Sequence, residues 1–448
     1  MKDLLIKFLD LFYALATLER ERYFRSFFFA LSVVGLIWWW QKAFQFHPEY
    51  FAPSWQLILA LAPVYVPLIL LRIFWKVWFD YIRSDFIRKQ GSVLLELKIP
   101  KETNKSPLAM EIFLTALFQT GSSSYVDTFW KGKVRPWFSL ELASFDGEVH
   151  FFIWTQLKWR NIIEAQIYAQ YPNVEIYEVP DYAAGIPYDI SRYPFWATHY
   201  KLTKDDVFPI KTYVDYGLDK DPKEEFKIDP ITSVLEYLGS LKKGQMAWIQ
   251  ILIQAHRKST FTDDATFSFG RDWVKEAKSK IEEIRKEATP DRGPDVTAFP
   301  NPTKGQIEQI GSIERSLGKF PFDTMMRGMF FWDPSEFDAG GISGLIGSVR
   351  QYSSNFFNGF KLGKFTDYDY WWLDPGRVRR TRLERHYLDA YRRRAFFQPP
   401  YKNYRNKPFI LTTEEIATIY HFPGGVAATP TFARIMSKKS EPPSNLPT

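Results

Sequence analysis

The chain has 448 residues, of which 46% are apolar and 24% charged, a composition that excludes a disordered protein. Its mean hydropathy of −0.27 excludes a protein that lies wholly within a membrane. The net charge of +7 is too small to indicate nucleic-acid binding by itself, and the absence of cysteine excludes disulfides, thiolate-bound zinc, iron–sulfur clusters and a cysteine nucleophile.

Two apolar segments lie near the N-terminus. Residues 26–41 and 50–71 carry no charged side chain, and a helix needs ~20 such residues to cross a bilayer. Tryptophans gather near the ends of these segments, as is typical of a membrane interface. We therefore predict two transmembrane helices, at about 26–44 and 50–75, rather than a buried helical hairpin in a soluble core.

Basic residues indicate the orientation of this predicted hairpin. Lysines and arginines precede the first segment and follow the second, whereas the connection over 41–49 carries only Lys42. By the positive-inside rule, both ends of the hairpin are expected in the cytoplasm. The first 20 residues have the apolar spacing of an amphipathic helix on the membrane surface, and residues 1–90 form the predicted membrane domain.

Residues 91–190 have the pattern of one compact α+β unit. An alternating strand starts at Ser92, and a helix follows Ser106 and Pro107. Asp146–Gly147 predicts the turn of a β-hairpin, after which a second helix ends at Pro172 and a final strand covers 174–179. This β-α-β-β-α-β order is that of the ferredoxin-like split unit.

The same order recurs over residues 191–365, so the predicted fold class is α+β with a duplicated ferredoxin-like (βαββαβ) cytosolic domain. A helical insertion at 255–319 interrupts the second unit. Its charged helix has one narrow apolar stripe, which predicts a protruding helical hairpin that either contacts a partner or is a solvated excursion. We expect the open faces of the two sheets to pack against each other and to bury the rings of His150, Phe152 and Trp154.

Motifs for chemistry are missing from the sequence. There is no P-loop string, no serine-nucleophile elbow, and no ligand spacing among the six histidines. Paired carboxylates such as Glu414–Glu415 lie at helix-start signals, where they favour the positive end of a helix. The sequence therefore predicts no enzyme activity, no catalytic residue, no cofactor and no metal site.

The strongest binding candidate is an arginine run in the predicted basic C-terminal helical segment, residues 366–448. Tyrosines and phenylalanines alternate with these arginines, a mixture that binds phosphate backbones and bases or anionic lipid headgroups. The alternative is a solvated helix face that docks on acidic protein surface. The candidate residues are Arg377, Arg379, Arg380, Arg382, Arg385, Arg392, Arg393 and Arg394.

Five segments resemble a known family. Residues 95–117, 149–179, 229–254, 344–361 and 408–447 look like the membrane-anchored N-terminal region of type IV secretion and conjugation-type ATPases related to the HerA/FtsK superfamily, which are common in candidate-phyla bacteria. In that family the last segment leads into the ATPase core, and this sequence stops before one. The resemblance thus implies a stand-alone or truncated version without a motor.

From these observations we expect a non-catalytic protein of the bacterial inner membrane, with both termini and the soluble domain in the cytoplasm. It would tether or assemble a DNA- or protein-translocating machine whose P-loop ATPase is a separate chain, within a homo- or hetero-oligomer. One alternative is a membrane-attached nucleic-acid-binding module that uses the arginine run, and another is a structural envelope protein.

Overall fold

The computed structural model describes residues 48–99, 105–121, 124–189, 191–219, 228–257, 271–289, 301–367, 374 and 376–424. The chain divides into two compact units, one of residues 1–78 and 368–376 and one of residues 79–367 and 377–448. The predicted amphipathic helix and the first predicted span at 26–44 lie outside the described residues.

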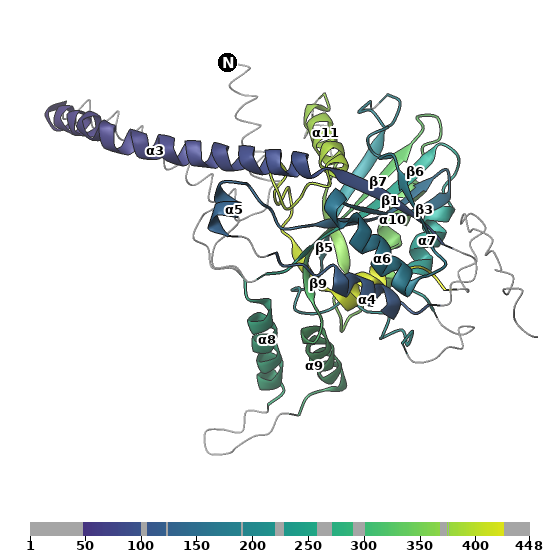
Figure 1. The fold of residues 1–448 in the computed structure, drawn as a ribbon. Coiled ribbons are helices and arrows are strands. Elements are labelled where there is room, and N and C mark those ends of the chain that lie inside the picture. The colour runs from purple at the N-terminus through teal and green to yellow at the C-terminus, as the bar shows by residue number, and fades with distance from the viewer. Residues whose placement is uncertain are drawn as a thin grey trace, which may run out of the picture. The chain divides into compact units, whose positions relative to one another are not determined.

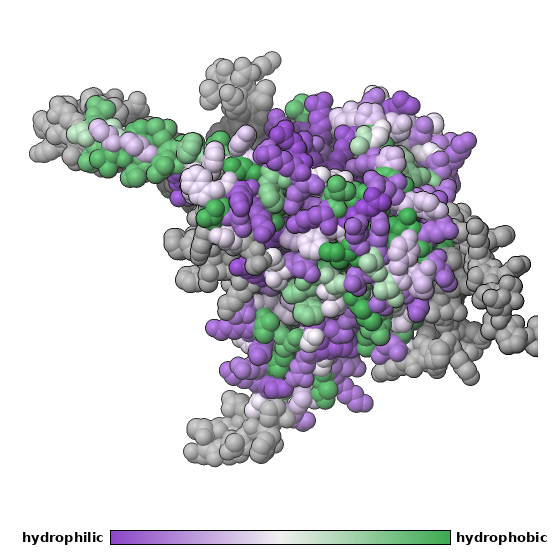
Figure 2. All heavy atoms as spheres, viewed as in Figure 1, coloured by the Kyte–Doolittle hydropathy of each residue, from purple (hydrophilic) through white to green (hydrophobic). Residues whose placement is uncertain are grey.

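Helix α3 (Pro48–Gln90) contains the second predicted span and continues well beyond it. Pro63 and Pro67 do not end the helix, and its part from Leu59 to Gln90 is long and apolar enough to cross a membrane. Its large apolar side chains from Leu59 to Val77 are exposed, as Figure 2 shows along the described part of the helix, whereas Phe79 and Ile82 are buried. The exposed ones are Leu59, Leu61, Val64, Tyr65, Val66, Leu68, Ile69, Leu70, Leu71, Ile73, Phe74, Trp75 and Val77.

A single antiparallel sheet forms the centre of the second unit (Figure 1). Its strands are β1 (Ser92–Lys98), β2 (Phe138–Phe145), β3 (Glu148–Gln156), β4 (Glu175–Val179), β5 (Phe195–Leu202), β6 (Gln245–Ala255), β7 (Pro321–Trp332), β8 (Phe360–Phe365) and β9 (Phe409–Thr412). Their spatial order is β4-β1-β3-β2-β6-β7-β5-β8, and β9 pairs with the start of β7. The predicted helical segment 366–448 therefore also contributes a strand.

The same strand arrangement occurs twice along the chain. The first four strands lie in the order β4-β1-β3-β2, and the next four in the order β8-β5-β7-β6. The halves join edge to edge, because β2 pairs with β6 from Phe138↔Ile253 to Phe145↔Met246. The predicted face-to-face packing of two sheets is wrong: β2 and β6 satisfy each other's backbone hydrogen bonds and make one continuous sheet.

One face of the sheet is covered by α4 (Leu108–Ala116), α6 (Arg160–Gln170), α7 (Ile231–Gly239), α10 (Ala339–Gly347) and α12 (Thr413–Ile419). Alternate residues of each strand enter this core, as Val93, Leu95 and Leu97 do in β1. The period-2 pattern of the sequence is thus confirmed as a buried sheet face.

Helix α11 (Val378–Arg392) packs on the opposite face. There Phe152 stacks on Tyr182 with ring centroids 4.9 Å apart, and Trp154 lies 5.6 Å from Trp137. Both rings are buried, so packing accounts for the aromatic strand, although the covering elements are α11 and its neighbours rather than a second sheet.

The insertion contains α8 (Trp273–Glu287) and α9 (Lys304–Leu317), which lie side by side in Figure 1. The stripe predicted from the sequence, Trp273, Ala277, Ile281 and Ile284, is buried. It packs in a small core with Ile313 of α9 and with Val207 and Ile410 of the main body. The helical hairpin is therefore attached to the sheet domain at its base and keeps charged outer surfaces.

Candidate functional site

Helix α11 carries most of the arginine run, and its apolar residues decide how it lies. Leu383, Tyr387, Leu388 and Tyr391 follow the three- and four-residue spacing of one helix face, and all four are buried against the sheet. Arg377 precedes the helix with a left-handed φ of 57°. This orientation leaves Arg394, just after the helix, buried and Arg379, Arg380 and Arg392 half-buried. Arg377, Arg382, Arg385 and Arg393 are exposed.

Arg394 is fully buried and belongs to an internal ion-pair network. Its Nε donates to Glu141 Oε1 at 2.9 Å and its Nη2 to Glu141 Oε2 at 3.1 Å, while Nη1 and Nη2 both donate to Asp181. Tyr182 also donates to Glu141, at 2.7 Å. Arg394 thus fastens the end of α11 to strand β2, and it is not part of an exposed basic surface, which corrects its assignment to the binding run.

The network continues across the sheet along one line of paired residues. Glu141 pairs in register with Gln250, and Gln250 with Arg327. Gln250 donates to Glu141 at 2.7 Å and accepts from Arg327 Nε at 2.6 Å. Burial lowers the pKa of Arg327 to about 10, and although burial alone would raise the pKa of Glu141, the charge and hydrogen bonds of Arg394 hold it below its usual value. The side chains of Glu141, Gln250, Arg327 and Arg394 are therefore hydrogen-bonded within this network.

Three more arginines pair with neighbouring groups of the chain, two of them half-buried and Arg393 on the surface. Arg380 pairs with Glu384 at 2.8 Å and with Asp367 at 2.7 Å, Arg392 donates to the Ala183 carbonyl at 3.0 Å, and Arg393 pairs with Asp389 at 2.9 Å. Exposed side chains remain on Arg377, Arg382, Arg385 and Arg393, and Arg385 lies 5.0 Å from the ring centroid of Tyr188. The continuous run in the sequence therefore becomes a smaller and interrupted basic surface.

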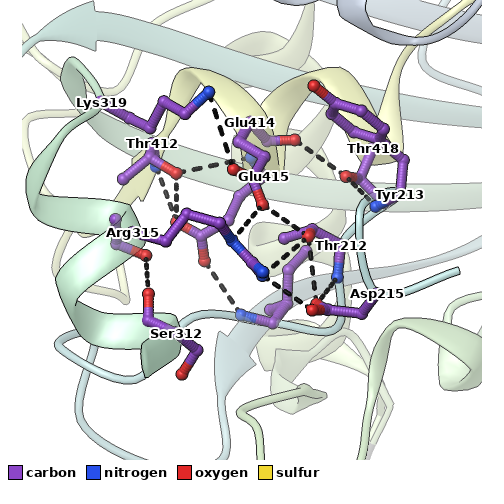
Figure 3. Close-up of polar contacts among 12 residues, drawn as sticks. Thr212, Tyr213, Asp215, Ser312, Arg315, Lys319, Thr412, Glu414, Glu415 and Thr418 are labelled. Carbon is purple, nitrogen blue, oxygen red and sulfur yellow. Dashed lines mark hydrogen bonds and ion pairs between the residues drawn. The ribbon is translucent and has the colours of Figure 1, made fainter. Parts of the chain in front are cut away.

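A second polar cluster joins α9, α12 and the segment after β5 (Figure 3). Arg315 pairs with Asp215 at 2.8 Å and with Glu414 at 3.0 Å, and Lys319 pairs with Glu111 at 2.6 Å. Glu415 accepts from the backbone and the hydroxyl of Thr412 in a capping box. The predicted helix-start role of the Glu414–Glu415 pair matches this geometry for Glu415, whereas Glu414 belongs to the ion pairs.

Glu415 is expected to make the stability of the protein pH-dependent. Burial raises its pKa to about 7, and neighbouring Glu414 adds to the shift. Because the folded state then holds a proton that the unfolded chain releases near pH 4.3, stability is fully present below that pH and falls as the pH rises through about 7. Relative to E415Q, wild type should lose about 1–2 kcal/mol between pH 5.5 and pH 8.

Denaturant unfolding of the full chain in detergent at both pH values measures this difference. The exposed Glu282 of α8 supplies the matched control E282Q, which should follow wild type at both pH values. Parallel pH dependences for wild type and E415Q would contradict the assignment.

Sequence analysis missed Glu141, Gln250 and Arg327 as parts of a cluster. A usable signal was the isolated charge inside otherwise apolar strands, as in FSLELASF and TMMRGMFF. A charge on the buried face of a strand requires a buried partner, and the missing information was which distant segment supplies it. Within the described ranges, no group of three or more His, Asp or Glu side chains is positioned to hold a metal ion.

Comparison with known proteins places this arrangement in a family. Residues 85–434 match the model of a domain of unknown function, DUF8128. The chain belongs to the DUF8128 family. The match starts within α3 and passes beyond α12, so the whole sheet, both polar clusters and the insertion lie inside the family domain. No curated protein matches the chain.

Proposed function

We propose that this DUF8128 protein is a membrane-anchored, non-catalytic tether or assembly component of a DNA- or protein-translocating machine. The observation that carries the proposal is the exposed apolar surface of α3 from Leu59 to Val77, because soluble proteins rarely leave an apolar surface of this extent uncovered. Insertion into a bilayer would remove the free-energy cost of exposing these apolar side chains to water.

The polar clusters support a binding role over a catalytic one. The carboxylates of Glu141 and Glu415 already accept hydrogen bonds from neighbouring arginine, tyrosine, threonine or backbone groups. A general acid or base must instead lie within reach of a substrate. The charged outer surfaces of α8 and α9 offer a partner an accessible docking element at the edge of the sheet domain.

The finer topology forms part of the same proposal. The repeated fourth-first-third-second strand order supports a duplicated ferredoxin-like unit. Arg72, Lys76, Arg83, Arg88 and Lys89 follow the uncharged segment 50–71 and favour a cytoplasmic location for the sheet domain at the bacterial inner membrane. The resemblance to type IV secretion and conjugation-type ATPases supports a P-loop ATPase on a separate chain as the partner.

Affinity purification of the tagged full chain from its native membranes tests this role. We expect a P-loop ATPase of the HerA/FtsK superfamily to co-purify with wild type, and the purified chain alone to hydrolyse no ATP. A variant with charge reversals on the exposed α8 residues Lys275 and Lys278 would report whether the insertion makes the contact. ATP hydrolysis by the chain alone would contradict the proposal.

A nucleic-acid-binding module is the second candidate function, because exposed arginines remain on α11. Arg382 and Arg385 lie three residues apart on the outer side of the helix, where a phosphate backbone can reach both. Binding to DNA that weakens steeply with salt, and that R382E/R385E abolishes, would favour this candidate. Absence of binding at low salt would remove it.

A further inference from the structure

The sheet domain contains a strongly basic cavity of about 210 Å³. Its walls come from segments far apart in the sequence: the end of α3, the loop after α5 (Tyr125–Phe129), the turn after β3 and the end of β6. Among the described residues that line it, the charged ones are Arg83, Lys133, Arg135, Lys158 and Arg257, all of them cations. This cavity is separate from α11 and from the two polar clusters described above.

Backbone packing holds the cations around the cavity. Gly132 has a left-handed φ of 66°, and a Cβ built on it would lie 2.4 Å from the carbonyl oxygen of Ile82. Only glycine permits this approach, which brings Lys133 beside the turn of α3 that carries Arg83. Arg135 donates to the Ala255 carbonyl at 3.0 Å, and Arg257 donates to the Gly121 carbonyl at 3.1 Å.

Two further lining residues present buried polar atoms that have no hydrogen-bond partner among the described residues. They are the indole nitrogen of Trp159 and the side-chain oxygen of Gln398, and Gln398 is only 5% exposed. Buried polar groups in proteins are normally paired, so each unpaired group requires an explanation. The Trp159 N–H can only donate, and the Gln398 amide can present its NH₂ group after a flip.

Two of the lysines lie close enough for their charges to affect each other. Burial lowers the pKa of Lys158, and the positive charge of Lys133 lowers it further. Arg135 has Asp323 at 3.7 Å, but that carboxylate also bonds His256 at 2.7 Å. An anion in the cavity would offset this repulsion and would accept from the Trp159 N–H.

We propose that this cavity binds a phosphate-bearing anion. Guanidinium groups match the oxygens of a phosphate in geometry, and lysines add point charges, so the combination of Arg83, Arg135, Lys133 and Lys158 suits phosphate better than a monovalent halide. The volume is several times the ~30 Å³ that one water occupies in the liquid, which leaves room for the group and its oxygen shell.

The phosphate has two sources, a soluble ion or a lipid headgroup. Arg83 lies on α3, whose part from Leu59 to Gln90 is long and apolar enough to cross a membrane. The headgroup source rests on the membrane anchoring proposed above, whereas the soluble source does not.

Two measurements on the purified full chain test the proposal. Isothermal titration calorimetry in detergent with inorganic phosphate and pyrophosphate tests the soluble source. Native mass spectrometry after incubation with phosphatidylglycerol or phosphatidylcholine tests the headgroup source. We expect pyrophosphate binding, selective retention of phosphatidylglycerol, or both.

The double variant K158Q/R257Q should weaken the observed binding at least tenfold. Both side chains are exposed at the rim of the cavity, so the variant should keep its fold. The matched control is K242Q/K243Q in the connection between α7 and β6, which removes the same charge from exposed residues outside the cavity lining and should bind as wild type does. W159F, which keeps the ring packed on Phe138 and removes one donor, should weaken binding severalfold.

Each result decides the question. Pyrophosphate binding that K158Q/R257Q loses supports the cavity with a soluble ligand, and phosphatidylglycerol retention with the same loss supports a lipid headgroup. No binding in either measurement, or equal binding by K158Q/R257Q and K242Q/K243Q, overturns the proposal. Loss of membrane anchoring alone would leave the pyrophosphate result unchanged, so failure of the proposed function remains distinguishable.

Discussion

Replacement of Arg394 by methionine should lower the free energy of unfolding by about 3–5 kcal/mol, the cost of leaving a buried charge without its partner. In R394M the carboxylate of Glu141 stays fully buried and loses two hydrogen bonds from the guanidinium. Asp181 loses the same partner but remains partly exposed to water. The expected result is a large shift of the unfolding midpoint of the full chain in detergent, followed by near-UV circular dichroism.

The neighbouring arginine provides the control. Arg393 is exposed and pairs with Asp389 one helical turn away, so R393M should change stability by no more than about 0.5 kcal/mol. The double variant R394M/E141Q should recover part of the loss, because it also removes the stranded charge. Equal effects of R394M and R393M would contradict the network.

Aspartate substitutions at Leu68 and Ile69 in α3 should abolish membrane association of a chain that starts at residue 48. Each replacement of a central leucine or isoleucine by aspartate costs about 3–4 kcal/mol of insertion free energy. Both side chains are more than half exposed, so the substitutions break no packing inside the protein. Carbonate extraction of membranes measures the effect, and L68D/I69D should appear in the soluble or aggregated fraction.

The control for this experiment is L108D. Leu108 is also exposed, at the start of α4 in the sheet domain, and its substitution should leave the chain in the membrane pellet. Extraction of the unsubstituted chain, or retention of L68D/I69D, would contradict a spanning role for α3. The truncation at residue 48 removes the other apolar segment, so α3 alone determines the result.

Local patterns in the sequence predict most of the sheet. The alternation after Ser92 and the Asp146–Gly147 turn identify β1, β2 and β3 because each strand buries one face in a two-residue period. The pairing of β2 with β6 has no such signal. Both strands are rich in apolar residues, and no local pattern indicates which strand each one pairs with. Strand β9, which directly precedes α12, was not predicted, because its four residues are too few to show a two-residue period.

The candidate sites could also be predicted only in part from the sequence. The sequence identifies the arginines around α11, but the buried position of Arg394 depends on Glu141, which precedes it by some 250 residues. The basic cavity was missed entirely, because its five cations come from separate segments and none of these is basic enough to stand out. Charge that converges only after folding leaves no pattern in a linear sequence.

Strand β9 has a consequence for synthesis on the ribosome. The start of β7 obtains its second neighbour only when residues 409–412 have emerged, almost at the end of the described chain. At roughly 5–20 residues per second, more than 300 residues are translated after α3 before that strand is available, which takes roughly 15–60 seconds. During that interval the incomplete sheet exposes a strand edge, and chaperone protection is expected to matter most there.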